Sequence, residues 1–251
     1  MEIRKIIYYE EIDSTNTQVD RLAKEGAEHG TVVVAGQQSA GKGRRGRQWE
    51  SPKGVNLYLS LLLRPEMEPQ KAPMLTLVMA YSIAKVIRAT GFADANIKWP
   101  NDIILGGKKI CGILTEMQLV GDAIGHIVVG VGVNVNTIEF PKELEDKATS
   151  LYLASGRRIE IEELQNHILT TFAEDYEKFV DCGDLSFLRE AYNEMLINRG
   201  REVLVLEPNC EYKALALGIN ESGELIVETE DGCKQGVYAG EVSVRGIYGY
   251  T

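Results

Sequence analysis

Residues 98–111 read Lys-Trp-Pro-Asn-Asp-Ile-Ile-Leu-Gly-Gly-Lys-Lys-Ile-Cys, and this stretch predicts how the central part of the chain folds. Gly106-Gly107 separates two short apolar segments, which is typical of a β-hairpin with a two-residue turn. The expected cross-strand pairs are Leu105–Lys108, Ile104–Lys109, Ile103–Ile110 and Asp102–Cys111. Asp102 and Lys109 would then be diagonal neighbours on one face, about 7–8 Å apart at the backbone. Such a pair is either a surface ion pair or two groups that hold one ligand between them.

Another strand is expected over residues 129–136, where valine alternates with glycine and asparagine. The alternation places the valines on one face, and the other face carries Gly130, Gly132, Asn134 and Asn136. Glycine weakens a strand unless something approaches its backbone closely. We interpret this face as a ligand floor that ends in an amide. Close packing of a helix over the glycines is the alternative.

Strand and helix patterns are mixed through the first two hundred residues. Helical periodicity over 75–86 and 161–179 predicts two helices, and the Thr15-x-x-Gln18 spacing predicts a capped helix over 15–27. The expected fold class is α+β, with helices packed on a mixed β-sheet. The segments expected to form strands, by their apolar and β-branched content, are 3–12, 31–38, 55–63, 108–119 and 124–135.

After Asn198-Arg199-Gly200 the pattern changes to short alternating segments separated by turn residues. Several short strands so close together predict a small β-barrel. We therefore expect a larger domain over residues 1–198 and a small barrel domain over residues 199–251. About 50 residues form only a small core, so the barrel is expected to be stabilised by packing against the larger domain.

Composition and charge narrow the classes of function. Among 251 residues, 27 Lys+Arg against 37 Asp+Glu give a formal net charge of −10, which argues against a surface that coats nucleic acid or an anionic membrane. The N-terminal residues lack the apolar core of a signal peptide, and no uninterrupted apolar run approaches roughly 20 residues, so a cytoplasmic protein is expected. No His, Cys and carboxylate cluster has the spacing of a metal site, although Mg²⁺ that travels with a nucleotide needs few protein ligands.

The basic loop, residues 38–49, reads Gln-Ser-Ala-Gly-Lys-Gly-Arg-Arg-Gly-Arg-Gln-Trp and holds four cations and no acid. Its glycines allow backbone N–H groups to converge on an anion, and its cations add charge-assisted hydrogen bonds. A bound phosphate is the expected partner of this loop. A nucleic-acid contact is the alternative, but it usually comes with a basic face and interleaved aromatic residues. A P-loop is disfavoured because Gly43 stands where that motif has Ser or Thr.

Five stretches taken together resemble the signature blocks of the biotin protein ligases, in the order of that family: Ser14-Thr15-Asn16, Gly41–Arg47, Lys98–Asp102, Lys109–Leu114 and Gly132-x-Asn134. The motifs cover roughly residues 8–140, and the layout covers the whole chain, including a small C-terminal Src-homology-3-like barrel. The resemblance implies the catalytic fold of the biotin and lipoate ligases. The chain departs from the family pattern at Lys42. Many members have an arginine there, whose guanidinium can make a bidentate contact that lysine cannot. Some members carry an N-terminal DNA-binding domain; here 13 residues precede Ser14, so a ligase without repressor activity is expected.

The resemblance also implies a two-step reaction. ATP and biotin form biotinyl-5′-AMP and pyrophosphate, and a lysine on the biotin carboxyl carrier protein of a carboxylase then takes up the biotinyl group. Biotin, ATP and Mg²⁺ are the expected ligands, neither nucleic acid nor a membrane is an expected partner, and homodimer and monomer both stay open. The alternatives are a lipoate or octanoate ligase on the same fold, and a nonenzymatic binder of nucleic acid.

Roles for individual residues follow from the same resemblance. The catalytic candidates are Lys109, Arg44 and Asp102, because fixed cations are needed where the biotin carboxylate meets the α-phosphate. Asp102 would orient either Mg²⁺ or the incoming amine, and no protein metal site is expected. The residues expected to bind biotin are Ser14, Thr15, Asn16, Gln38, Gly41, Lys42, Gly43, Arg44, Lys109 and Gly112. The residues expected to bind ATP or the adenylate are Lys42, Arg44, Arg47, Trp49, Asn101, Asp102, Gly132 and Asn134.

Overall fold

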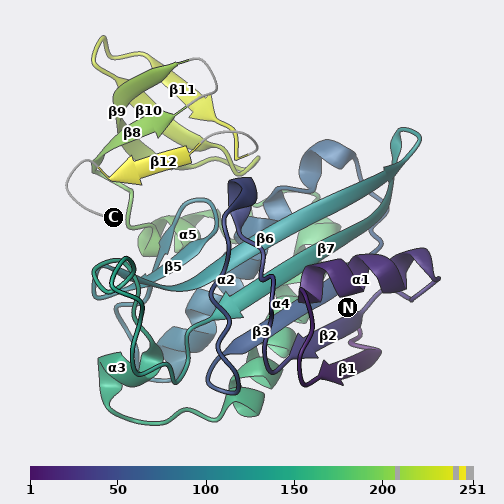
Figure 1. The fold of residues 1–251 in the computed structure, drawn as a ribbon. Helices are drawn as coiled ribbons and strands as arrows, with labels where there is room; N and C mark the ends of the chain where they lie inside the picture. Colours follow the sequence, from purple (N-terminus) through teal and green to yellow (C-terminus); the bar gives the residue numbers. More distant parts are fainter. Residues whose placement is uncertain (207–209, 240–242, 247–251) are drawn as a thin grey trace.

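The computed structural model describes residues 1–206, 210–239 and 243–246, which form two β-sheets with helices packed on the larger one (Figure 1). The larger sheet has seven strands in the order β1-β2-β3-β7-β6-β5-β4, with only β1 and β2 parallel. The expected α+β class, a mixed sheet with packed helices, is confirmed. The seven strands are β1 Lys5–Tyr9, β2 Thr31–Ala35, β3 Leu57–Leu63, β4 Asn96–Lys98, β5 Asp102–Leu105, β6 Lys108–Val120 and β7 Ala123–Val133.

Helices cover both faces of this sheet because its central strands are apolar on both sides. Helix α1 (Thr15–Lys24) packs on one face, where its Val19 meets Val33 and Leu62. Helices α2 (Met74–Ala89) and α4 (Ile161–Cys182) pack against each other on the opposite face and share the main core with β3 (Figure 1). Every residue of β3 is buried, as expected for a strand covered on both faces. Two short helices, α3 (Leu151–Ser155) and α5 (Arg189–Met195), complete the larger unit.

Residues 69–89, which include α2, are long and apolar enough by composition to cross a membrane. In the structure 72% of the most apolar window of this stretch is buried. Its residues lie against α4 and the sheet, as a core helix does.

The β5–β6 hairpin has the predicted two-residue turn but a different register. Gly106 and Gly107 have φ of +56° and +78°, values that glycine adopts without strain. Leu105 pairs with Lys108 and Ile104 with Lys109 as predicted, but a bulge then shifts the pairing to Ile103–Cys111 and Asp102–Gly112. The predicted pairs Ile103–Ile110 and Asp102–Cys111 are therefore wrong.

The bulged residue is Ile110, and the backbone groups on either side of it bond segments other than β5. The N–H of Lys109 donates to the carbonyl of Lys147 at 2.8 Å, and the carbonyl of Lys109 accepts from the N–H of Thr149 at 3.0 Å. Lys109 still pairs with Ile104, and the carbonyl of Ile110 accepts from the N–H of Asn134 at 2.7 Å, so the ladder to β5 resumes at Cys111.

Two predicted boundaries differ from the observed ones. Strand β7 ends at Val133, so Asn134 and Asn136 lie beyond it and not on the strand as predicted. The chain turns away there because the N–H of Leu151 and the N–H of Tyr152 bond the carbonyls of residues 134 and 135. Helix α1 begins after Ser14, which stands at the N-cap with no side-chain cap hydrogen bond. The predicted capping box at Thr15 is therefore wrong.

The smaller sheet lies in the C-terminal part and has five antiparallel strands in the order β11-β10-β9-β8-β12. Its strands are β8 Glu202–Leu206, β9 Glu211–Ile219, β10 Leu225–Thr229, β11 Lys234–Val237 and β12 Ser243–Gly246. This unit contacts the larger one: the indole N–H of Trp99 donates to the carbonyl of Gly223 at 3.1 Å, and the hydroxyl of Tyr238 donates to the carbonyl of Gln70 at 2.6 Å. The domain boundary at residue 199 stays a prediction.

The buried hydroxyl of Tyr192 on α5 generates a stability prediction. Tyr192 is fully buried, and within residues 1–206, 210–239 and 243–246 its hydroxyl has no hydrogen-bond partner; burial also raises the pKa of this phenol. A buried unpaired hydroxyl costs roughly 1–3 kcal/mol. We expect Tyr192→Phe to leave the free energy of unfolding in urea unchanged or to raise it by about 1 kcal/mol.

Tyr58→Phe is the matched control, because the Tyr58 hydroxyl donates to the carbonyl of Pro52 at 3.1 Å. This substitution is expected to lower the free energy of unfolding by about 1 kcal/mol. A larger loss for Tyr192→Phe than for Tyr58→Phe would contradict the assignment.

Candidate active site

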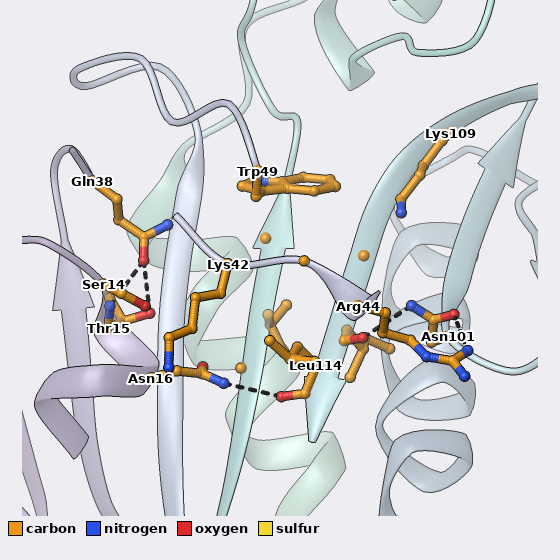
Figure 2. Close-up of a pocket in the computed structure, with 16 residues that line it drawn as sticks. Ser14, Thr15, Asn16, Gln38, Lys42, Arg44, Trp49, Asn101, Lys109 and Leu114 are labelled. Atoms are coloured by element: carbon orange, nitrogen blue, oxygen red, sulfur yellow. Dashed lines mark hydrogen bonds between the residues drawn. The ribbon is translucent and has the colours of Figure 1, made fainter. Parts of the chain in front are cut away.

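A cleft opens on the α1 side of the larger sheet, over strands β6 and β7 (Figure 2). It holds about 440 Å³ of empty space, counted out to its open mouth. The basic loop, the first turn of α1 and the 98–102 segment meet around it, although they are far apart in the sequence. Its lining consists of Ser14, Thr15, Asn16, Gln38, Lys42, Gly43, Arg44, Trp49, Asn101, Lys109, Gly112, Ile113, Leu114, Gly130, Val131 and Gly132.

The floor of the cleft is made of glycines on paired strands. Gly112 pairs with Gly132, and Leu114 pairs with Gly130. A Cβ added at Gly130 would lie 1.9 Å from Oδ1 of Asn16, and one at Gly132 would lie 2.5 Å from the indole of Trp49. The glycines are therefore required by close approach of side chains from above, one of which comes from helix α1. The alternative interpretation, close packing of a helix over the glycines, is therefore observed at Gly130, whereas the ligand floor stays a prediction.

The first turn of α1 forms one wall through a polar network. Ser14, Thr15 and Asn16 are buried. The N–H of Thr15 donates to Oε1 of Gln38 at 2.8 Å. The amide nitrogen of Gln38 in turn donates to the hydroxyl of Ser51 at 2.9 Å. These bonds fix the position of helix α1 relative to the start of the basic loop.

Lys109 and Asp102 form a direct ion pair inside the opposite wall. Nζ of Lys109 lies 2.6 Å from Oδ1 of Asp102, with side-chain exposures of 21% and 14%. The same ammonium lies 5.1 Å from the ring centroid of Trp49, within cation–π range. The neighbouring Cys111 is buried, and burial raises the pKa of its thiol. Cys111 therefore stays protonated and is a poor nucleophile.

The basic loop is held by bonds within itself and to its surroundings. Arg44 donates to Oδ1 of Asn101 at 3.1 Å and to the carbonyl of Ala239 in the small sheet unit at 2.7 Å. Burial lowers the pKa of this guanidinium, which stays charged because its ordinary value is so high. The N–H groups of Gly43 and Trp49 donate to carbonyls of the loop itself, so these two cannot also converge on an anion as the glycine spacing predicts.

Twelve of the sixteen residues predicted for the site line the cleft. The other four are Gly41, Arg47, Asp102 and Asn134. Asp102 lies behind Lys109 as its ion-pair partner. Arg47 is exposed, and a Cβ at Gly41 would lie 2.4 Å from the carbonyl of Trp49, which indicates a role in closing the loop. The amide of Asn134 donates to the carbonyl of Thr149 at 3.1 Å and does not line the cleft, and its contact with the adenylate stays a prediction.

Sequence reasoning missed several residues of the cleft. Leu114 lines it and could have been found, because it shares a strand face with Gly112 two residues earlier. Ser60 and Glu116 form hydrogen bonds with Asn16, although neither residue lines the cleft itself. Ser60 carries a local signal, since it is a small polar residue in the otherwise leucine- and tyrosine-rich run 57–63.

Comparison with known proteins gives concordant results. Residues 8–134 match the model of the Biotin/lipoate A/B protein ligase family, and residues 200–245 match the model of the biotin protein ligase C terminal domain. The chain is similar to the bifunctional ligase/repressor BirA of Bacillus spizizenii, at 39% identity over 95% of this chain and 74% of that protein. It is also similar to the biotin–[acetyl-CoA-carboxylase] ligase of Paracoccus denitrificans, at 32% identity over 93% of this chain and 98% of that protein.

Solved structures agree with these sequence matches. The biotin protein ligase from Aquifex aeolicus in complex with biotin and ATP superimposes with a TM-score of 0.84 and 31% identity, over 97% of this chain and 99% of that chain. The family match over residues 8–134 includes strands β2 to β7 of the larger sheet and every residue that lines the cleft.

The contact between Trp49 and Gly132 generates a prediction that needs no ligand. A Cβ at residue 132 would overlap the indole ring, so Gly132→Ala is expected to push Trp49 outward. The chain has two tryptophans, and Trp99 is only 1% exposed. Acrylamide quenching of the intrinsic fluorescence should therefore increase in Gly132→Ala, and the increase should vanish in a Trp49→Phe background. An unchanged quenching constant would show that the ring does not rest on this glycine.

Proposed function

We propose, since the chain belongs to the Biotin/lipoate A/B protein ligase family, that it is a biotin protein ligase. It would activate biotin with ATP and transfer the biotinyl group to a lysine of a biotin carboxyl carrier protein. The observation that carries this proposal is the cleft itself, where Lys109 and two cations of the basic loop surround a glycine floor. Support also comes from the fold, which is shared with an Aquifex aeolicus ligase in complex with biotin and ATP.

In the first step the cations would bring two anions together. A carboxylate oxygen of biotin attacks the α-phosphorus of ATP, and pyrophosphate leaves with its bonding electron pair. Fixed positive groups at the meeting point stabilise the charge that builds up there, and we assign this role to Lys109, Arg44 and Lys42. Asp102 would keep the Lys109 ammonium in place, given the 2.6 Å ion pair between them. We propose that Mg²⁺ enters with ATP as part of the substrate, because such an ion needs few protein ligands.

In the second step the acceptor amine attacks the carbonyl carbon of the adenylate. The bond to the AMP oxygen breaks, AMP leaves, and the amine loses a proton as the amide forms. No enzyme nucleophile takes part in this scheme. The small Ser14-Thr15-Asn16 wall with Gln38 would hold the polar end of biotin, whereas Trp49, Asn101 and Gly132 would face the adenylate.

Four further assignments belong to this proposal. The acceptor is the carrier domain of a biotin-dependent carboxylase, and the protein acts in the cytoplasm without nucleic acid. The chain divides into a catalytic domain over 1–198 and a small β domain over 199–251, in line with the separate family match over residues 200–245. A homodimer is proposed from the resemblance, and its mass in solution by sedimentation equilibrium would test it.

Exchange between ATP and pyrophosphate tests the proposed function directly. Radioactive pyrophosphate should enter ATP only when biotin is present, because exchange requires reversible formation of the adenylate. Lipoate and octanoate at the same concentrations should give no exchange. Exchange driven by lipoate in place of biotin would assign the chain to the lipoate ligases, and a lack of exchange with any of the three acids would refute the ligase assignment.

Replacement of Lys109 tests the electrostatic part of the mechanism. Lys109→Ala should lower the rate of adenylate formation by about 10²–10³-fold, the usual effect of removing one preorganised donor. Lys108→Ala is the matched control, because Nζ of Lys108 donates to the carbonyl of Glu145 at 2.7 Å and lies outside the cleft lining. Far-ultraviolet circular dichroism should be unchanged in both variants. Equal rates in the two would remove Lys109 from the chemistry.

A further inference from the structure

Glu116 is a carboxylate at the edge of the cleft that none of the roles above uses. It lies on β6, opposite Val128 of β7, and follows Gly112 and Leu114 at alternate positions on the same strand face. Gly112 and Leu114 line the cleft, so Glu116 stands at the next position outward along the floor. Its side chain is 42% exposed.

Each carboxylate oxygen of Glu116 has its own donor, and the two donors come from different segments. Oε2 accepts a hydrogen bond from the amide nitrogen of Asn16 at 2.7 Å. Oε1 accepts from Nζ of Lys42 at 3.2 Å. Figure 2 shows the Lys42 side chain extending toward the Asn16 amide, and both donate to Glu116. One side chain of β6 therefore ties the basic loop and the first turn of α1 to the sheet.

The contact with Glu116 also fixes which way the Asn16 amide is turned. A carboxylate can only accept, so the Asn16 atom beside it must be the nitrogen. Its other hydrogen is directed to the carbonyl of Leu114 at 3.3 Å, and Oδ1 lies 2.6 Å from the hydroxyl of Ser60. Both hydrogens of the Asn16 amide are thus engaged within the protein, while Oδ1 keeps a second lone pair. Its orientation decides where the single hydroxyl hydrogen of Ser60 points, next to Thr15 at 2.7 Å.

We propose that Glu116 is a positioning residue of the ligand cleft, which holds the basic loop through Lys42 and fixes the donor and acceptor pattern of the α1 wall through Asn16. This inference rests on the proposed function for its ligand, biotin. If the Asn16 amide were reversed, its NH₂ group would face Ser60, and the Ser60 hydrogen would turn toward Thr15. The polar wall would then offer a different pattern to a ligand whose polar end has fixed donors and acceptors.

Glu116→Gln is the informative variant because glutamine has one acceptor oxygen and cannot serve both donors. We expect biotin to bind about tenfold more weakly by titration calorimetry, in keeping with the loss of one charged hydrogen bond at a half-exposed site. The kcat of biotin-dependent exchange at saturating biotin should stay within about threefold, and the effect should appear in KM for biotin. Trypsin should also cut the basic loop severalfold faster without any ligand.

Two controls separate position from charge. Asp122→Asn removes the same charge from the exposed turn between β6 and β7 and should leave biotin affinity and loop cleavage unchanged. Gln118→Glu combined with Glu116→Gln restores the net charge two residues further along the same strand face, about 7 Å away, and should not restore affinity.

A double-mutant cycle tests the contact between Lys42 and Glu116 directly. Lys42→Met should speed cleavage of the loop, and adding Glu116→Gln to it should give less than the product of the two effects.

Several outcomes would overturn the inference. Wild-type affinity and wild-type loop cleavage in Glu116→Gln would do so, as would recovery of affinity by Gln118→Glu. A fall in thermal stability, with kcat and affinity reduced together, would indicate a merely structural role. Failure of the proposed function is distinguishable, because a wild-type chain without biotin-dependent exchange would refute the ligase assignment, whereas faster loop cleavage in Glu116→Gln would still show the tether.

Discussion

The cleft depends on the close approach of side chains to bare backbone at three positions of the sheet. Gly112 and Gly132 face each other across β6 and β7, and the ring of Trp49 rests on both, while Gly130 receives the amide of Asn16. The basic loop is located through Trp49 and helix α1 through Asn16. Because a methyl group at any of the three would displace its neighbour by a substantial fraction of an ångström or more, the glycine spacing sets the depth of the cleft and the place of both walls.

Local patterns predicted the parts of the molecule that local forces determine. The turn at Gly106 and Gly107, the glycine face of β7 and the charge of the basic loop are all visible in short stretches of sequence. The register of β5 on β6 is not visible in this way, because the bulge falls at Ile110, whose carbonyl accepts from the N–H of the distant Asn134. Asn134 was misplaced for the same reason, since its amide bonds the carbonyl of Thr149. A capping box at Thr15 failed because its N–H found a distant partner in Gln38.

Positive charge in this acidic chain is kept in place by internal partners. Lys109 has Asp102, Lys42 has Glu116, and Arg44 has two oxygen acceptors. Each pairing lowers the cost of holding a partly buried cation near other cations when no anion is bound. An arriving carboxylate or phosphate must then exchange partners with groups that are already satisfied, so the gain per contact is smaller than a bare cation would give. Selectivity in such a cleft comes from geometry more than from net attraction.

The small sheet unit is connected to this geometry at two points. Trp99 precedes Asn101 and Asp102 by two and three residues, and its indole N–H bonds the carbonyl of Gly223. Arg44 reaches the carbonyl of Ala239 directly. A shift of the small unit would therefore remove an acceptor from a guanidinium in the cleft and also disturb the segment that carries the partner of Lys109. Both links use backbone carbonyls, so they constrain the placement of the small unit more than the identity of its side chains. The small unit can therefore affect the site although none of its residues lines the cleft.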